Sequence, residues 1–254
     1  YRRFLVFNGV FGPLLLGTAV GTFFHGAAFT VSKDAMGAFG ANPVISQWAN
    51  AWHGLDAVAN PWNVILGIAI LFLARVLGTL YLLNNIDDAV LRPKLRRQVL
   101  IDALPFLLCF VAFLVHLLIA DGFAVSETGE IYVEPYKYLN NLLEMPVVLC
   151  GIVMTLCKAN FHRGIWFSGL GTVLTVLSLL LTVGYNHTAY YPSTADLQSS
   201  LTLANSCSSH FTLTAMSWVS LIIPFVLAYI IYAWRMIDKK SLTKQELSQE
   251  EHKY

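Results

Sequence analysis

The chain has 254 residues, of which 56% are hydrophobic and only 12% are charged. Its mean hydropathy is +0.61, whereas a water-soluble domain of this length needs more charge to cover its surface. The formal net charge of +1 excludes a nucleic-acid-binding protein, because a phosphate-binding surface requires a marked excess of Lys and Arg. We therefore expect a membrane protein.

Six apolar segments come close to the roughly 20 residues that an α-helix needs to cross a bilayer. They cover about residues 4–30, 62–84, 100–120, 142–158, 165–187 and 211–235. The fourth segment is short and reaches this length only if Leu142 begins it. The predicted fold class is therefore all-α: a polytopic membrane helix bundle over residues 1–236, followed by a polar tail at residues 237–254.

The distribution of Lys and Arg predicts the orientation of these segments. One set of connections and ends carries most of the basic residues: Arg2, Arg3, Arg92, Lys94, Arg96, Arg97, Lys158, Arg163, Arg235, Lys239, Lys240 and Lys244. The opposite connections hold only Lys33 and Lys137. Because cytoplasmic loops are enriched in Lys and Arg, we expect the first residue and the C-terminal tail to be cytoplasmic.

The first segment and the loop after it contain two packing signals. Gly17 and Gly21 form a GxxxG face, and small residues at this spacing let two helices approach closely. The partner of this face could be a neighbouring helix of the bundle, another subunit or a cofactor. Residues 46–62 contain three tryptophans, which settle at membrane interfaces, and we expect a surface helix or lid there.

Arg75 is the charged residue placed deepest in a predicted membrane segment. It lies ten residues, or about 15 Å, from the cytoplasmic end of the second segment. Such a charge is costly in a bilayer and usually faces a partner, the bundle interior or water. Asp102 in the third segment lies nearer the cytoplasmic surface and could pair with Arg75 if the Arg75 side chain extends toward that side. Two interpretations stay open: a structural pair, or a role near a proton path or an anionic cofactor group.

Most histidines fall in the outer half of the predicted bundle, and His116 and His187 are the best candidates for a role there. Imidazoles in these positions could ligate haem or relay protons, or they could make interfacial hydrogen bonds. No tight metal-ligand spacing is present, and the four cysteines form no disulfide framework. No nucleophile elbow or phosphate-binding loop occurs either. The sequence therefore predicts no catalytic and no metal-binding residue.

These observations leave a transporter, a channel and a respiratory-complex subunit as candidate functions. The stretch 190–236 then resembles the end of subunit II of cytochrome bd-type quinol oxidases, in which a Pro-Ser turn precedes polar clusters and a last helix with Pro and Tyr. The run at 12–29 and the entry to the second segment at Asn60–Trp62 are similar to the same family. The residues that match the tail pattern are Ser200, Leu201, Thr202, Asn205, Ser208, Leu213, Thr214, Pro224 and Tyr229.

The resemblance implies a haem-free subunit of a membrane-bound terminal oxidase that oxidises quinol, reduces dioxygen to water and contributes to the proton-motive force. The b- and d-type haems would lie in the partner, subunit I, and this chain would ligate no cofactor. A bound structural quinone and a small single-helix accessory subunit are also compatible with the family. The location would be the bacterial inner membrane, with the lipid bilayer around the bundle.

Members of that family have about nine helices, so the resemblance implies that this chain starts near the fourth and lacks roughly the first third of the subunit. The family's proposed proton route uses residues of that part, and no catalytic residue is carried over to this chain. The alternative function is a secondary transporter or channel subunit with Arg75 at an anionic site.

Overall fold

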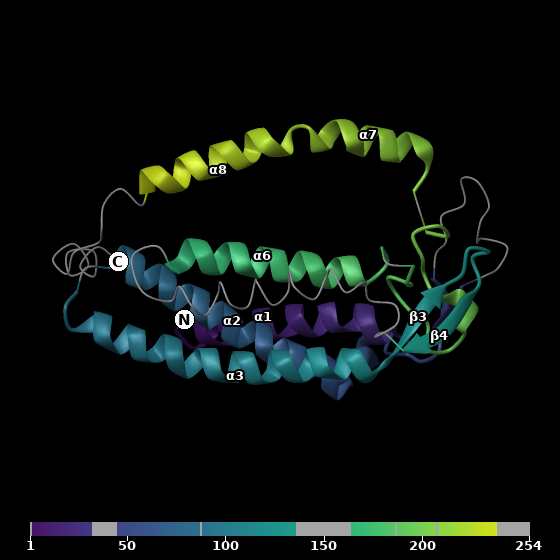
Figure 1. Ribbon diagram of the computed structural model, residues 1–254, viewed down its shortest axis with the longest axis horizontal. Helices are drawn as coiled ribbons and strands as arrows, with labels where there is room; N and C mark the ends of the chain where they lie inside the picture. The colour runs from purple at the N-terminus through teal and green to yellow at the C-terminus, as the bar shows by residue number, and fades with distance from the viewer. Residues whose placement is uncertain are drawn as a thin grey trace.

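A computed structural model describes residues 2–31, 45–86, 88–135, 164–185, 187–206 and 208–237, and these residues are mostly helical (Figure 1). The elements in chain order are α1 (Arg2–His25), β1 (Phe29–Val31), β2 (Ile45–Trp48), η2 (Leu55–Ala59), α2 (Pro61–Asn85), α3 (Leu91–Ile119), β3 (Asp121–Val125), β4 (Ile131–Pro135), α6 (Gly164–Thr182), η3 (Leu197–Ser199), α7 (His210–Ser220) and α8 (Ile223–Ile237).

Four of the described helical stretches are long and apolar enough to cross a membrane. They are Arg3–His25, Pro61–Asn85, Leu91–Ile119 and His210–Ile237, and Ser168–Thr182 in α6 forms a shorter apolar helix. The predicted segment at residues 142–158 lies outside the described residues. The expectation of a helical membrane bundle is therefore confirmed in this coarser form, with four candidate membrane helices.

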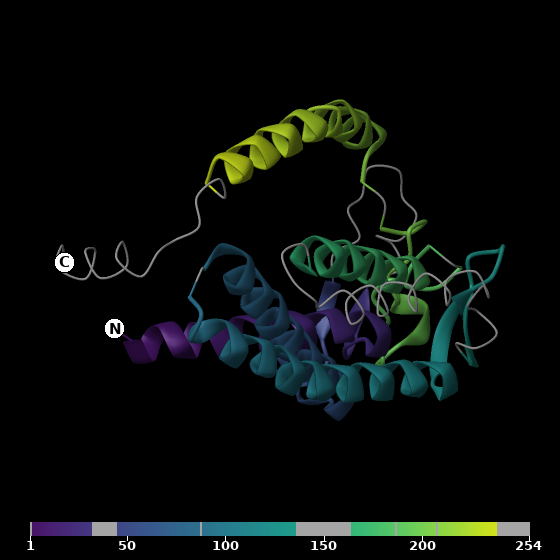
Figure 2. The same cartoon turned by 60° about the vertical axis from the view of Figure 1, so that its left-hand side comes forward.

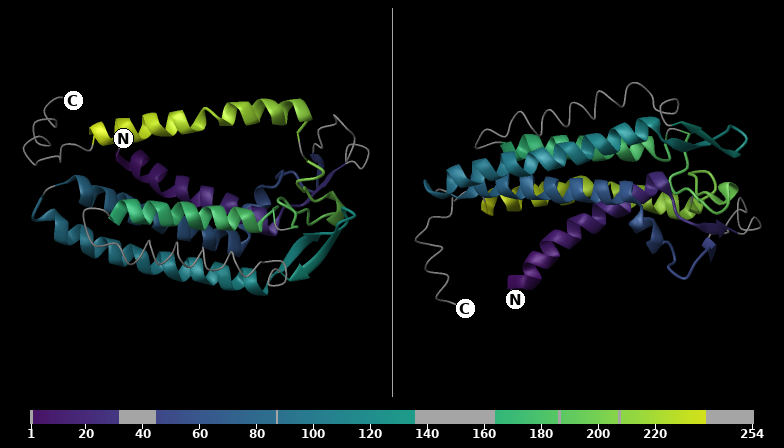
Figure 3. Two further views of the ribbon diagram at one scale, coloured as in Figure 1. Left: turned by 45° about the horizontal axis from the view of Figure 1, so that its top comes forward. Right: turned by 90° about the horizontal axis from the view of Figure 1, so that it is seen from below.

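The helix α2 packs against both α1 and α3, and α6 lies beside α2. A buried cluster joins these four helices and includes Phe24, Leu66, Phe110, Phe113 and Leu179. The first turns of α1 leave the bundle at an angle, as Figure 3 shows, and their apolar side chains are exposed. The paired strands gather at the opposite end of the bundle (Figures 1 and 2).

The first helix is shorter than the predicted segment at residues 4–30. It ends at His25 because Gly26 adopts a positive φ of 71° and donates its N–H to the carbonyl of Thr22. Glycine in this left-handed conformation is a common helix terminator. The following residues form β1, whose Phe29 is fully buried.

Residues 46–62 do not form the surface helix that was one of the two expectations for them, and the other, a lid, stays a prediction. The segment begins in β2, which pairs antiparallel with β1, and continues through turns into the short 3₁₀ helix η2. Polar side chains break a helix here: Asn50 accepts the N–H of Trp52 at 3.0 Å and donates to Asp56 at 2.8 Å. Gly54 then takes a positive φ of 86°. Local hydrogen bonds of this kind compete with helix formation.

The last apolar segment is divided into α7 and α8 by a break at Leu221 and Ile222. Pro224 explains the break, because it has no N–H to donate to the carbonyl four residues earlier and its ring clashes with that carbonyl. None of the described side chains of α7 and α8 is buried. In Figures 1 and 2 this pair runs along one side of the other helices.

The predicted GxxxG face of α1 lies against α2. A Cβ added to Gly17 would come within 2.8 Å of the Cα of Gly67, and one added to Gly21 would come within 2.9 Å of the Cα of Asn63. Backbones this close leave no room for larger side chains. In the structure, the partner of this face is therefore a helix of the same bundle.

We expect Gly17→Ala to destabilise the protein by about 1–3 kcal/mol, because the new methyl group overpacks the α1–α2 contact. Gly9→Ala is the matched control, since a Cβ at Gly9 meets nothing within 4 Å on the same helix. The thermal unfolding midpoint of the purified protein should fall for the first variant alone. Equal midpoints for the two variants would contradict the close contact.

Candidate functional site

Arg75 of α2 and Asp102 of α3 form an ion pair between the apolar stretches of these two helices. The Nε and Nη2 atoms of Arg75 both lie 3.1 Å from Oδ1 of Asp102. Gln98, one turn before Asp102 on α3, donates its Nε2 to Oδ2 of the same carboxylate at 3.0 Å. The two helices therefore bring three polar side chains together, two of which were singled out by the sequence.

The two charges of this pair differ in exposure. The side chain of Asp102 is 2% exposed, whereas that of Arg75 is 48% exposed. The guanidinium carbon also lies 5.9 Å from the ring centre of Phe72, within the range of a cation–π contact. The buried carboxylate thus has a partner on each oxygen, while the half-exposed guanidinium remains accessible to a further anionic or polar group.

His116 of α3 meets His25 of α1 at the end of the bundle that carries the strands. Their Nε2 atoms are 3.0 Å apart, and Nδ1 of His25 lies 2.7 Å from Oδ1 of Asn63 in α2. The His116 ring stacks on Trp62, with ring centres 3.8 Å apart and an angle of 3° between the planes. The structure therefore joins three helix ends through a cluster of imidazoles, an amide and an indole.

His187, the other candidate histidine, does not reach this cluster. It lies exposed in the loop after α6 with a positive φ of 53°, and its carbonyl accepts the N–H of Val125 at 2.7 Å. Within the described ranges, no group of three or more His, Cys, Asp or Glu could hold a metal ion.

The loop before α7 contains the first part of the tail motif and folds as a hydrogen-bonded turn. Ser200 is fully buried and accepts the N–H of Ser193 at 2.9 Å. Asn205 accepts the N–H of Thr202 at 2.8 Å and donates to the Ser200 carbonyl at 2.9 Å. Leu201 pairs with Tyr191. These residues therefore shape the loop, whereas the described side chains of the motif on α7 and α8 are exposed, as is Ser208.

The same loop connects the strand pairs to the helix ends. We call the strands β1 to β4, the 3₁₀ helices η2 and η3 and the loop at residues 187–206 together the cap of the bundle. Ser193 bridges to Ala27 and donates its hydroxyl to the carbonyl of Phe29. Gln198 exchanges two hydrogen bonds with the backbone of Ile131 in β4, at 2.8 and 3.2 Å. Burial, with a smaller effect of the Asp56 carboxylate, raises the pKa of Tyr191 in this cap. Tyr191 therefore stays neutral well above physiological pH.

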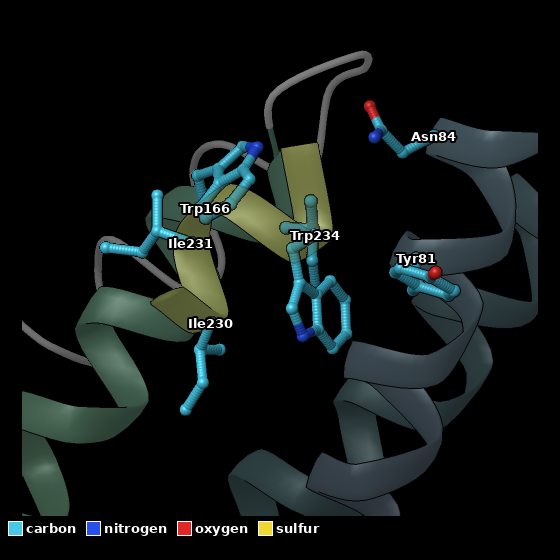
Figure 4. A pocket seen from close by; sticks show the side chains of 7 residues that line it. Tyr81, Asn84, Trp166, Ile230, Ile231 and Trp234 are labelled. Carbon is cyan, nitrogen blue, oxygen red and sulfur yellow. The ribbon is translucent and has the colours of Figure 1, made fainter. Parts of the chain in front are cut away.

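A cavity of about 280 Å³ lies between α2, α6 and α8, near the end of the bundle opposite the cap (Figure 4). Its lining is almost wholly apolar and aromatic, and Tyr81 and Asn84 supply the polar groups from α2. Trp234 of α8 and Tyr81 make an edge-to-face contact, with ring centres 5.6 Å apart. The remaining lining residues are Ile165, Trp166, Ile230 and Ile231.

The sequence matches the family of cytochrome bd terminal oxidase subunit II over residues 1–237. The chain belongs to this family. It is also 25% identical to proteins named cytochrome bd-I ubiquinol oxidase subunit 2 from Escherichia coli strains K12, O6:H1 and O157:H7. Each of these alignments covers 97% of this chain and 67% of the relative.

Sequence reasoning on this subunit II chain missed three residues of the polar clusters. Gln98 carries a usable signal, because residues four apart share a helix face and its amide can reach Asp102. Nothing in the sequence connects His25 to His116, which lie 91 residues apart. Asn63 follows Pro61 and Trp62 and looks like a polar residue at a helix start, although its side chain is fully buried.

We expect Arg75→Leu to destabilise the subunit by about 3–5 kcal/mol, because it leaves the buried Asp102 carboxylate without its cation. The double variant Arg75→Leu/Asp102→Leu should recover most of this loss, since it removes both charges. Thermal unfolding of the purified complex measures both changes. Arg97→Leu, at an exposed site of α3, is the control. A double variant as unstable as the single one would contradict the pairing.

Proposed function

We propose that this chain is the haem-free subunit of a cytochrome bd-type complex that oxidises quinol and reduces dioxygen to water. The match to the subunit II family over residues 1–237 carries this proposal. It makes the chain a subunit of a cytochrome bd ubiquinol oxidase complex with a subunit I partner. The b- and d-type haems would be held by that partner, and the complex would contribute to the proton-motive force.

The histidine geometry supports the placement of the haems on subunit I. An axial haem ligand must point a free ring nitrogen at the iron. The Nε2 atoms of His25 and His116 instead point at each other, and Nδ1 of His25 is held by Asn63. His25 therefore has no ring nitrogen free for an axial bond, and His116 keeps only Nδ1.

The proposed topology has six membrane spans, with the connection between α2 and α3 and the first turns of α3 on the cytoplasmic side and the cap outside. The basic residues around Arg92–Arg97 support this orientation, because cytoplasmic loops are rich in Lys and Arg. In this topology residues 1–236 form the membrane bundle and residues 237–254 form a cytoplasmic tail. The exposed apolar side chains of α7 and α8 suit contact with lipid or with subunit I.

The cavity between α2, α6 and α8 is a suitable place for a structural quinone. A quinone has a flat ring with carbonyl acceptors and a long apolar tail. Trp166 and Trp234 could stack on the ring, the hydroxyl of Tyr81 and the amide of Asn84 could donate to its carbonyls, and the isoleucines would contact the tail. The cavity is wide enough for a ring but supplies few polar groups, as expected for a bound rather than a reacting quinone.

A reduced-minus-oxidised visible spectrum tests the proposed function most directly. The complex would be purified through a tag on the full-length subunit. We expect bands of b- and d-type haem in the preparation, because subunit I should copurify. A haem-free preparation would refute the oxidase proposal and favour a transporter or channel with Arg75 at an anionic site.

We also expect Arg75→Leu to lose assembly or quinol oxidase turnover. The haem-to-protein ratio measures assembly, and oxygen uptake with quinol measures turnover. Arg75→Leu/Asp102→Leu separates the two roles of Arg75: restored turnover would assign it to pairing, and an assembled complex with low turnover would assign it to the reaction. Unchanged haem content and activity in the single variant would exclude both roles.

A further inference from the structure

The imidazoles of His25 and His116 meet head-on rather than face to face. Their planes are within 14° of each other, their ring centres are 5.2 Å apart, and their Nε2 atoms are 3.0 Å apart. Each nitrogen lies on the rim of its own ring, so a centre separation this large requires both nitrogens to lie near the line between the centres. The geometry is therefore that of a nearly linear N–H···N hydrogen bond.

The neighbours of His25 determine which atom of this pair carries the proton. Nδ1 of His25 lies 3.2 Å from the carbonyl oxygen of Gly21 and 2.7 Å from Oδ1 of Asn63. A backbone carbonyl can only accept, so Nδ1 carries a hydrogen. In the neutral ring Nε2 is then an acceptor, and Nε2 of His116 must be the donor. Nδ1 of His116 is left as the basic atom of the neutral pair.

We propose that His25 and His116 form a proton-binding site that takes up one proton as a unit. The proton adds to Nδ1 of His116, and no other bond has to break. A second proton would need a hydrogen on Nε2 of His25, facing the N–H of His116 across 3.0 Å. Two donors and two like charges cannot share that space. The site therefore holds a single positive charge or none.

Two features of the fold favour the charged form, whereas the positive end of the α2 dipole at Pro61, beside the same pair, and the burial of the rings oppose it. His25 and His116 both lie in the last turn of their helices, where the helix dipole attracts positive charge. The ring of His116 also stacks on Trp62, and an indole face stabilises a cation placed over it. Uptake of the proton would thus strengthen the link between the ends of α1, α2 and α3.

The cap at this end of the bundle also carries two carboxylates, Asp56 on η2 and Asp121 at the start of β3. Neither carboxylate makes a hydrogen bond or ion pair with the two imidazoles in the part of the chain that the structure describes. The charge of the pair is therefore not cancelled by direct contact and depends on its own protonation.

Nitrogen-15 NMR of the histidine-labelled complex tests this proposal by counting imidazolium groups. The count is compared between about pH 8 and about pH 5, the range in which imidazoles titrate. The wild type should gain one more proton than His25→Gln/His116→Gln, and each single variant should also gain one more than the double variant. A difference of two for the wild type would show independent histidines, and a difference of zero would show a permanently neutral pair. Either result would overturn the proposal.

A second measurement needs no variant, in case the substitutions disturb the helix ends. In the wild-type complex a through-bond nitrogen–nitrogen coupling should connect the two Nε2 atoms across their shared hydrogen. Its absence would overturn the proposed geometry. This site rests on the contacts within the chain and not on the proposed oxidase function, so a haem-free complex with the coupling would refute only the latter.

Discussion

The close approach of α1 to α2 determines where the polar groups of this bundle meet. Gly17, Gly21 and Gly67 remove the side chains that would keep the two helices apart. This contact brings the amide of Asn63 within reach of His25 at the end of α1. The packing of α3 on α2 then brings Asp102 to Arg75 and His116 to His25. In a bilayer such contacts matter more than apolar burial, because lipid is as apolar as the helix surface.

The bundle separates its polar groups along its length. Between the apolar stretches of α2 and α3 the described residues include one ion pair, Arg75 with Asp102, where a charge without a partner would be costly. The cap instead contains many backbone groups outside helices, and side chains such as Ser193, Ser200 and Asn205 satisfy them. Irregular backbone is tolerated there because it lies at the end of the bundle and is covered by its own hydrogen bonds.

Four candidate membrane helices were predictable from sequence, because hydropathy and length are strong constraints in a bilayer. The charged pair was predictable in kind, since Arg75 needs a partner and Asp102 was the nearest acid on the next helix. The turn structure of the loop at residues 46–62 was not, because the tryptophans indicate an interface but not a backbone conformation. Its conformation depends on Asn50 and Gly54, whose local effects compete with the apolar pattern.

The histidine cluster shows a different limit. His116 was a candidate because of its place near a helix end, but its partner and the direction of its hydrogen bond depend on tertiary packing. No spacing rule relates residues on α1 and α3 that are joined only through their common neighbour α2. The tail motif behaves similarly, since Ser200 and Asn205 identify the family but reveal their structural role only in the folded loop.

The break between α7 and α8 affects how the backbone of the last helix is paired. Pro224 cannot donate an N–H to the carbonyl of Ser220, four residues earlier, as an uninterrupted helix would require. Hydrocarbon tails contain no donor for such an oxygen. The backbone adjusts locally, since Leu221 and Ile222 donate to the carbonyls three residues before them at 3.2 and 3.0 Å, and the last helix can thus bend at this point while these N–H groups stay paired.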